Sequence, residues 1–235
     1  CSEEDERGWN LSKTSVGGKI MIQVTPEQKM EVINHYQFTG ELLSQEPYGS
    51  GHINDTFLLV YDIERMGRMK VILQRMNKDI FTKPEELMEN VVGVTSYLRE
   101  RIIENGGDPE RETLNVIPTP DGAMFYKDSK GDYWRAYKFI TDALGYDKVE
   151  NPDDFYQSAV SFGNFQRLLA DYPAETLHET IKGFHDTKAR FQVFKEVVAA
   201  DVMGRAKDVE KEIQFVLDRE EIADYFCDLL AKGEL

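Results

Sequence analysis

Pro47-Tyr48-Gly49-Ser50-Gly51-His52-Ile53-Asn54-Asp55-Thr56 is the stretch from which the architecture of this chain is predicted. It lies between two runs with the composition of strands, residues 41–46 and 56–61. Two glycines one residue apart allow positive φ and let the backbone approach an anion closely. The small polar residues beside them add N–H and hydroxyl donors, so the loop is a candidate phosphate-binding loop.

The residues after Thr56 separate two kinds of phosphate-binding loop. Phe57-Leu58-Leu59-Val60-Tyr61 is a β-rich run with no sign of a helix start. A glycine loop between two strands covers ATP phosphates in kinase-type folds, whereas a glycine loop before a helix marks P-loop and Rossmann sites. The hairpin form fits better here. An ordinary hairpin turn is the alternative, because a lone Gly-x-Gly is weak evidence.

Length and composition set the class of protein. A chain of 235 residues with 41% hydrophobic residues predicts one large domain or two small lobes with a real core. The sequence has no apolar run of about 18 residues, so no membrane span is expected. The formal net charge of −15 argues against binding nucleic acid or an anionic membrane through a basic face, while a local cationic pocket for a nucleotide stays compatible.

The two cysteines, Cys1 and Cys227, are too few for a disulfide framework or a metal set. They fit a reducing, cytoplasmic compartment. Cys1 at the first position is interpreted as a processing boundary, with the lipidated cysteine of a lipoprotein as the less favoured alternative.

Local signals predict the elements. Residues 1–24 form an extended lead-in, and Thr25-Pro26-Glu27-Gln28 begins a helix with an N-cap, a proline at N1 and a capping-box side chain. Strands are predicted at 41–48, 55–63 and 69–75, and a hairpin at 123–126 and 133–140. A long helix begins at residue 84 and ends before 106. Its apolar stripe is Leu87, Val91, Val94, Leu98 and Ile102.

These elements predict an α+β fold. A five-stranded antiparallel sheet with one long helix after the third strand is the small lobe of a kinase-like fold, here residues 25–141. Residues 142–151 are polar and form a linker. Residues 152–235 are helical and form part of a second lobe, with a short helix at 174–181 and another at 187–200.

A kinase-type site needs a cation in the third strand. Gln74 stands where the lysine of a V-A-I-K strand would stand, and Arg75 follows it. Lys70 or Arg75 is the substitute cation, with a solvent-facing strand residue as the alternative for Arg75.

The acid that holds the cation is expected from the following helix, at Glu85, Glu86 or Glu89. The first two also suit the first turn of a helix, where the dipole favours acidic residues, so Glu89 is preferred. The backbone of residues 138–142, including Phe139 and Ile140, would hold the adenine.

A second polar patch spans residues 184–191. Asp186 or Thr187 can cap the helix that follows. The side chains of His185, Asp186, Lys188 and Arg190 at one helix entrance equally suit a polyhydroxyl or anionic ligand.

Taken together, residues 48–56, 72–77, 88–90, 134–140 and 184–191 resemble the N-acetylhexosamine 1-kinases of the aminoglycoside phosphotransferase and choline kinase-like group. The resemblance runs from about residue 30 onward and implies ATP- and Mg²⁺-dependent phosphorylation of the anomeric hydroxyl of an N-acetylhexosamine. Gln-Arg in the third strand is an expected variant of that family. The implied sugar contacts are His185, Asp186 and Arg190. The implied ATP contacts are Gly49, Ser50, Gly51, His52, Asn54, Thr56, Gln74, Arg75, Glu89, Phe139 and Ile140.

The resemblance also implies a later catalytic loop with Asp-x-x-x-x-Asn spacing and Mg²⁺ ligands. Asn164 is the last asparagine of the sequence, and the residue five after Asp186 is Phe191, so the loop is absent here. We therefore expect a truncated kinase with no catalytic or metal-binding residue in this chain, no measurable phosphoryl transfer and weak nucleotide affinity. Uncovered helix faces would favour self-association. The alternatives are another small-molecule kinase acting on choline, homoserine or an aminoglycoside, and a non-catalytic binding module of the same fold.

Overall fold

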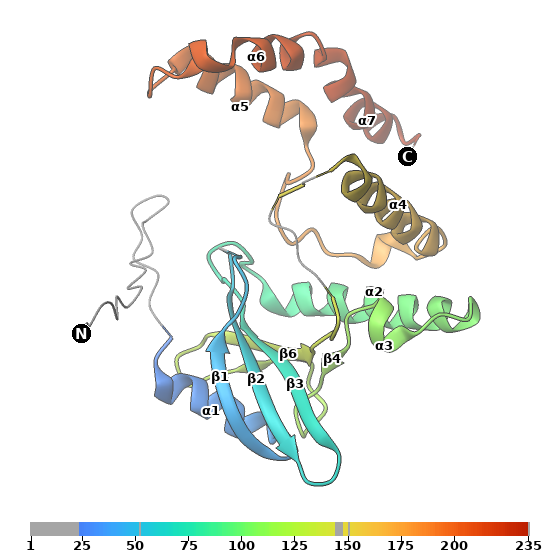
Figure 1. The fold of residues 1–235 in the computed structure, drawn as a ribbon. Coiled ribbons are helices and arrows are strands. Elements are labelled where there is room, and N and C mark those ends of the chain that lie inside the picture. Colours follow the sequence, from blue (N-terminus) through green and yellow to red (C-terminus); the bar gives the residue numbers. More distant parts are fainter. Residues whose placement is uncertain (1–23, 52, 144–147, 150, 235) are drawn as a thin grey trace, which may run out of the picture. The chain divides into compact units, whose positions relative to one another are not determined.

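The computed structural model describes residues 24–51, 53–143, 148–149 and 151–234. The chain divides into two compact units, Cys1–His178 and Glu179–Leu235 (Figure 1). The boundary between the units, after His178, lies later in the sequence than the linker predicted at 142–151. The reason is that Tyr172 and His178 contact the long helix of the first unit. Part of that linker lies outside the described residues. The predicted lead-in also lies outside the described residues, except for its last position.

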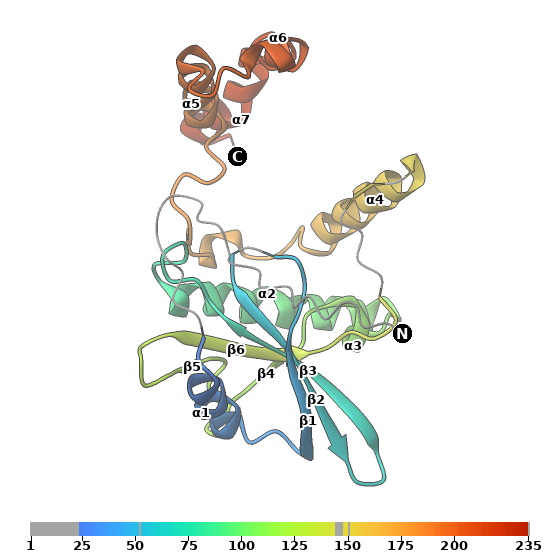
Figure 2. The ribbon, with the colours of Figure 1, turned by 60° about the vertical axis from the view of Figure 1, so that its left-hand side comes forward.

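The sheet of the first unit is antiparallel, as predicted. Its described strands run in the order β1-β2-β3-β6-β4, with β5 paired to β6 (Figure 2). The two-residue strand β4 is too short to show a periodicity, and the sequence did not predict it. The strands are β1 (Glu41–Pro47), β2 (Asp55–Ile63), β3 (Gly67–Arg75), β4 (Val116–Ile117), β5 (Tyr126–Lys127) and β6 (Tyr133–Lys138).

Helix α1 (Pro26–Tyr36) begins where the capping signal predicted. The Thr25 side chain accepts a hydrogen bond from the Gln28 backbone N–H at 3.2 Å. The helix ends at Tyr36 and is followed by the C-cap Gln37, whose φ of 51° is left-handed. The Gln28 side chain does not close a capping box, because it is buried and donates to Asp128 at 2.7 Å.

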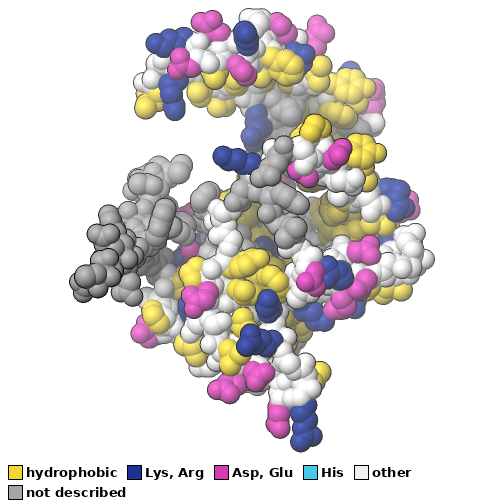
Figure 3. Space-filling model, in the orientation of Figure 1, with side chains coloured by type: hydrophobic (Ala, Val, Ile, Leu, Met, Phe, Trp, Pro, Cys, Tyr) yellow, Lys and Arg dark blue, Asp and Glu magenta, His cyan; other side chains and the backbone are white. Residues whose placement is uncertain are grey.

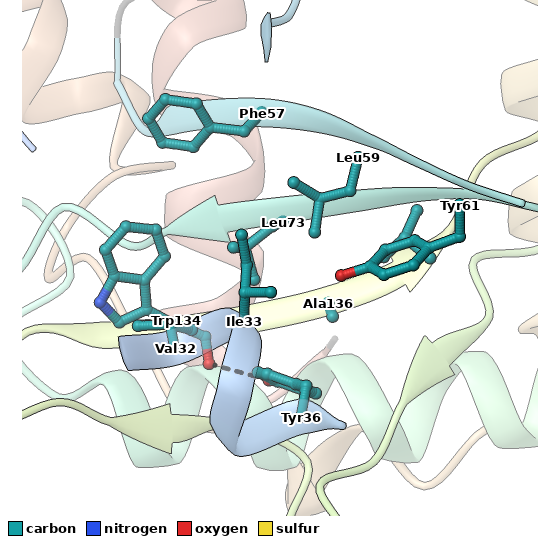
Figure 4. Close-up of a cluster of buried hydrophobic side chains, with 10 residues drawn as sticks. Val32, Ile33, Tyr36, Phe57, Leu59, Tyr61, Leu73, Trp134 and Ala136 are labelled. Carbon is teal, nitrogen blue, oxygen red and sulfur yellow. Dashed lines mark hydrogen bonds between the residues drawn. The ribbon is translucent and has the colours of Figure 1, made fainter. Parts of the chain in front are cut away.

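One face of the sheet packs against α1. Alternation along β3 and β6 points Leu73, Trp134 and Ala136 to this side. The Tyr36 hydroxyl donates to the Trp134 carbonyl oxygen at 3.3 Å (Figure 4). The fully or nearly fully buried members of this core are Val32, Ile33, Tyr36, Phe57, Leu59, Tyr61, Val71, Leu73, Trp134 and Ala136.

The other face packs against α2 (Pro84–Glu104), so the two helices lie on opposite faces of the sheet (Figure 2). Met88 is buried here against Met76 and Tyr133. Leu98 and Ile102 of the predicted stripe are buried, whereas the start of the helix buries Met88, which follows the predicted Leu87. The short helix α3 (Pro109–Glu112) follows, capped by Asp108.

The remaining elements of the described chain are helices. The first unit adds α4 (Pro152–Leu168) and a single 3₁₀ turn, η1 (Ala174–Thr176), in place of the predicted helix at 174–181. The second unit consists of α5 (Thr187–Ala200), the 3₁₀ turn η2 (Ala206–Val209), α6 (Glu210–Leu217) and α7 (Glu220–Lys232). Lys195 of α5 forms a salt bridge with Glu220 of α7 at 2.8 Å.

Hydrophobic side chains are exposed on the helices of the second unit (Figure 3). They include Phe215, Ile222, Tyr225, Phe226 and Leu230. This matches the expected uncovered faces, and self-association stays a prediction. In the part of the chain that the structure describes, no helix combines the length and hydropathy that crossing a membrane requires.

Candidate functional site

The loop between β1 and β2 is the first part of the candidate site. The Tyr48 backbone N–H donates to the Thr56 carbonyl oxygen at 2.9 Å and closes the hairpin. Gly49 has a φ of +82°, which a residue with a side chain would adopt only with strain, whereas Gly51 is not among the glycines with positive φ. Gly49, Ser50 and Gly51 are exposed, so the loop presents its backbone to solvent. His52 lies outside the described residues.

The end of this loop is anchored to the residues after β3. The Asn54 side-chain oxygen accepts from the Asn77 backbone N–H at 2.9 Å. The Asn77 side chain in turn donates to the Ile53 carbonyl oxygen at 3.0 Å. Asn77, which the sequence did not single out as a site residue, thus holds the base of the loop, and the Gln-Arg-Met-Asn run is the signal that could have found it.

Three side chains form a row across three neighbouring strands. Thr56 of β2 lies opposite Gln74 of β3, and Gln74 lies opposite Arg135 of β6. The Gln74 amide nitrogen donates to the Thr56 hydroxyl at 2.9 Å. The Arg135 guanidinium donates to the Gln74 amide oxygen through Nε at 3.0 Å and Nη2 at 2.7 Å. The loop therefore leads directly into the first member of a hydrogen-bonded row.

Arg135 is a cation beside Gln74 that the sequence did not single out as a site residue. Its Nη1 lies 3.9 Å from the Met88 sulfur, which places the row on the face of the sheet that α2 covers. Burial lowers the pKa of Arg135, although the electrostatic interaction with Tyr137 acts in the opposite direction. The available signal was a charged residue within the strand run Tyr133-Trp134-Arg135-Ala136-Tyr137.

Arg75 lies on the opposite face from Gln74. Its guanidinium contacts Asp55 at 2.6 Å and Asp132 at 3.1 Å, and its side chain is 11% exposed. The interpretation of Arg75 as a solvent-facing residue is therefore wrong, and its charge is engaged by carboxylates away from the row. Burial opposes ionisation of Asp132, but hydrogen bonds from Lys78 and Gln28 and the charges of Arg75 and Lys78 together lower its pKa.

Glu89, the preferred acidic partner of the cation, is directed elsewhere. Its carboxylate lies 2.6 Å from His178 Nε2 and is 66% exposed. The residue of α2 that faces Arg135 is Met88. Glu85 accepts from the Tyr133 hydroxyl at 2.5 Å, and this hydrogen bond is the main cause that lowers the pKa of Glu85.

The segment after β6 lies beside the loop. Phe139 and Ile140 are both half-buried. The Phe139 ring meets the Tyr48 ring edge-on at 5.5 Å between centroids. Lys70 Nζ lies 5.2 Å from the centroid of the same ring. The structure thus brings together the loop and the segment predicted to hold the adenine.

The patch at residues 184–191 belongs to the second unit. The Asp186 carboxylate accepts from the Ala189 backbone N–H at 2.8 Å, so the predicted capping role is observed. Arg190 donates to the Phe184 carbonyl oxygen at 3.1 Å and stacks on the Phe184 ring, against which the His185 ring also packs. A role of these side chains in binding sugar stays a prediction. Asp186 also borders a hollow of about 430 Å³ between α5 and α7, lined by Lys188, Phe191, Lys195, Glu220 and Asp224.

No protein-family model matches this chain. Among solved structures, the chain is similar to spectinomycin phosphotransferase, APH(9)-Ia, crystallised in complex with ADP and spectinomycin, at 14% sequence identity and a TM-score of 0.45. The match covers 87% of this chain and 59% of that chain. The present chain therefore spans less than two thirds of the length of that protein.

Proposed function

We propose that this chain is the nucleotide-binding portion of an ATP-dependent small-molecule kinase. The observation that carries the proposal is the hairpin loop with Gly49 at positive φ, followed directly by the hydrogen-bonded row of Thr56, Gln74 and Arg135. Sites of this type combine a glycine-rich hairpin over the phosphates, a cation held by the sheet and a helix after the third strand. The described strands and α2 occur in that order along the chain.

The residues present fit the phosphates of a nucleotide better than they fit a metal. The exposed backbone of Gly49, Ser50 and Gly51 and the guanidinium of Arg135 are donors for phosphate oxygens. ATP would supply the transferred phosphoryl group, and Mg²⁺ would offset its charge. Within the described ranges no group of three or more His, Cys, Asp or Glu side chains could hold a metal ion, so we assign no Mg²⁺ ligand.

The first test is calorimetric titration of the 235-residue chain with Mg-ATP and Mg-ADP. Gly49→Ala should weaken binding, because alanine at a φ of +82° distorts the loop. Gly67→Ala is a matched control. Gly67 has a φ of +86° in the turn at the far end of β2, and neither glycine has an atom within 4 Å of an added Cβ.

Both substitutions should cost about 1 kcal/mol of stability, but only Gly49→Ala should change nucleotide affinity. The proposal is overturned if the folded wild-type chain binds no Mg-ATP at millimolar concentration, or if the two variants bind it equally well.

For the acceptor, we propose an N-acetylhexosamine, with the protein acting in the cytoplasm. The support is the resemblance of residues 48–56, 72–77, 88–90, 134–140 and 184–191 to the N-acetylhexosamine 1-kinases, with His185, Asp186 and Arg190 as the implied sugar contacts. Titration with N-acetylglucosamine, N-acetylgalactosamine, choline and homoserine tests this. Arg190→Ala should abolish sugar binding, and Lys182→Ala, an exposed cation nearby, should not. Binding of choline without binding of either sugar would remove the sugar assignment.

A further inference from the structure

Arg135 has different neighbours from the other partly buried arginines of the sheet and of α2, a set that excludes the exposed Arg68 of β3. Arg75, Arg99 and Arg101 each contact a carboxylate within 3.1 Å. Arg135 donates to an amide oxygen and a thioether sulfur, and it forms no salt bridge with a described residue. This half-buried guanidinium therefore lacks a counter-charge in the described part of the chain.

A guanidinium in this position keeps its charge, because arginine does not deprotonate in proteins. Removing it from water costs free energy that a neutral amide offsets only in part. Two of its nitrogens donate to a single Gln74 oxygen, and the third faces Met88 Sδ at 3.9 Å. Since a guanidinium carries five N–H groups, it retains donors for a further acceptor.

The side chains around Arg135 would not repel an anion. Gln74, Thr56 and Met88 carry no charge, and burial raises the pKa of Tyr137, so that this phenol is neutral at pH 7. Of the acidic residues of α2, Glu85 accepts a hydrogen bond from the Tyr133 hydroxyl, and Glu89 contacts His178.

The hydrogen bonds of Gln74 give it a defined orientation. Its amide nitrogen donates to Thr56, and its oxygen accepts both bonds from Arg135. A lysine at position 74 would accept neither of the Arg135 bonds and would place a second cation beside it. Glutamine in the third strand therefore fits a site whose cation stands on the neighbouring strand.

We propose that Arg135 is the phosphate-binding cation of this site, that Gln74 is the residue that positions it, and that the ligand is the polyphosphate of a nucleotide. This rests on the proposed nucleotide-binding function and adds the residue that supplies the charge. The strand pairing places this cation on β6, one strand away from the position where a kinase-type lysine is expected.

The test is titration of the 235-residue chain with ATP, tripolyphosphate and adenosine. Arg135→Met should weaken binding of ATP and tripolyphosphate at least tenfold and leave adenosine binding unchanged. Arg135→Lys should restore part of the loss. Lys130→Met, an exposed cation on the hairpin between β5 and β6, is the control and should change none of the three affinities.

A second measurement separates binding from folding. Arg135→Met removes an uncompensated charge, and the new methionine can pack beside Met88. The melting temperature of this variant should therefore be equal to or higher than that of the wild type. A clear fall in melting temperature together with unchanged tripolyphosphate affinity would assign Arg135 a structural role and overturn the inference.

The outcomes for this inference and for the proposed function differ. If the wild type binds ATP and Arg135→Met binds it equally well, the inference fails and the nucleotide function stands. If tripolyphosphate binds in an Arg135-dependent way but adenosine does not bind and ATP binds no better than tripolyphosphate, Arg135 stands as the phosphate-binding cation, and the nucleotide as its ligand is overturned together with the proposed function. If the wild type binds neither ATP nor tripolyphosphate, both fail.

Discussion

Asp128 should be one of the most sensitive positions in the first unit. Its side chain is buried, and its carboxylate accepts four hydrogen bonds. Oδ2 accepts from Trp134 Nε1 and from Gln28 Nε2, both at 2.7 Å. Oδ1 accepts from the backbone N–H groups of Lys130 at 3.0 Å and Asp132 at 2.8 Å. The residue thus ties α1, the hairpin turn before β6 and the core tryptophan together.

Asp128→Ala would leave the fully buried Trp134 N–H without an acceptor and would release both backbone amides. Hydrogen bonds to a charged group contribute roughly 1.5–3 kcal/mol each, and an unsatisfied buried donor costs roughly 1–3 kcal/mol. Relief of the buried charge offsets part of this, so we expect a loss of about 3–4 kcal/mol. Asp128→Asn keeps one acceptor and should lose about half as much. Asp171→Ala, at an exposed position, should change stability by less than about 0.5 kcal/mol.

The measurement is hydrogen exchange followed by mass spectrometry, which reports the opening free energy of β2, β3 and β6 peptides separately from that of the second unit. Circular dichroism in urea provides the global stability. Fluorescence alone is unsuitable, because Trp134 is itself a partner of Asp128. If Asp128→Ala behaves like Asp171→Ala, the hydrogen bonds to this carboxylate do not stabilise the fold and the reasoning is refuted.

Three further changes test other contacts. Asn90→Ala should remove both hydrogen bonds to the backbone of His178, at 2.8 and 2.9 Å, and should speed hydrogen exchange there while β3 stays protected. Unchanged exchange would contradict this. The pKa of Asp132 is lower in the folded state than its unfolded value of about 3.9, so the ionised carboxylate stabilises the fold at pH values above about 3.9. This stabilisation is lost as the pH falls through the folded-state pKa. The stability difference between wild type and Asp132→Asn should therefore shrink from pH 7 to pH 2.5 in urea titrations, and a constant difference would argue against it. Thr25→Ala should cost about 1 kcal/mol in the same titrations, because it removes the N-cap of α1, and a loss below about 0.3 kcal/mol would contradict that role.

Most of the fold was predictable from local signals. Thr25-Pro26 begins α1, Pro84 begins α2, and α5 covers the predicted residues 187–200. These elements form where caps, prolines and apolar periodicity agree. The two-residue strand β4 was not predictable, because its pairing with β6 depends on a partner distant in sequence.

The candidate site was predictable only in part. The strand–loop–strand pattern places Gly49 in the loop, and it places Gln74 at the position in the third strand where it joins the row with Thr56. Arg135 did not follow, because its approach to Gln74 depends on the register between β3 and β6, which are 61 residues apart at this pair. Glu89 was preferred for its position along the helix, but rotation of α2 about its axis places Met88 against the row.

By itself, the sequence determined where α1, α2 and α5 begin, that the sheet is antiparallel and that a glycine loop joins its first two strands, because these depend on neighbouring residues and on alternation. Only the tertiary structure decided which charges meet. Gln74 and Arg75 are adjacent in the chain yet point to opposite faces, since successive side chains of a strand alternate. On the face that α2 covers, the amide of Gln74 therefore comes from β3 and the guanidinium of Arg135 comes from β6. The physical reason is the register between two strands that are distant in sequence, which no local pattern encodes.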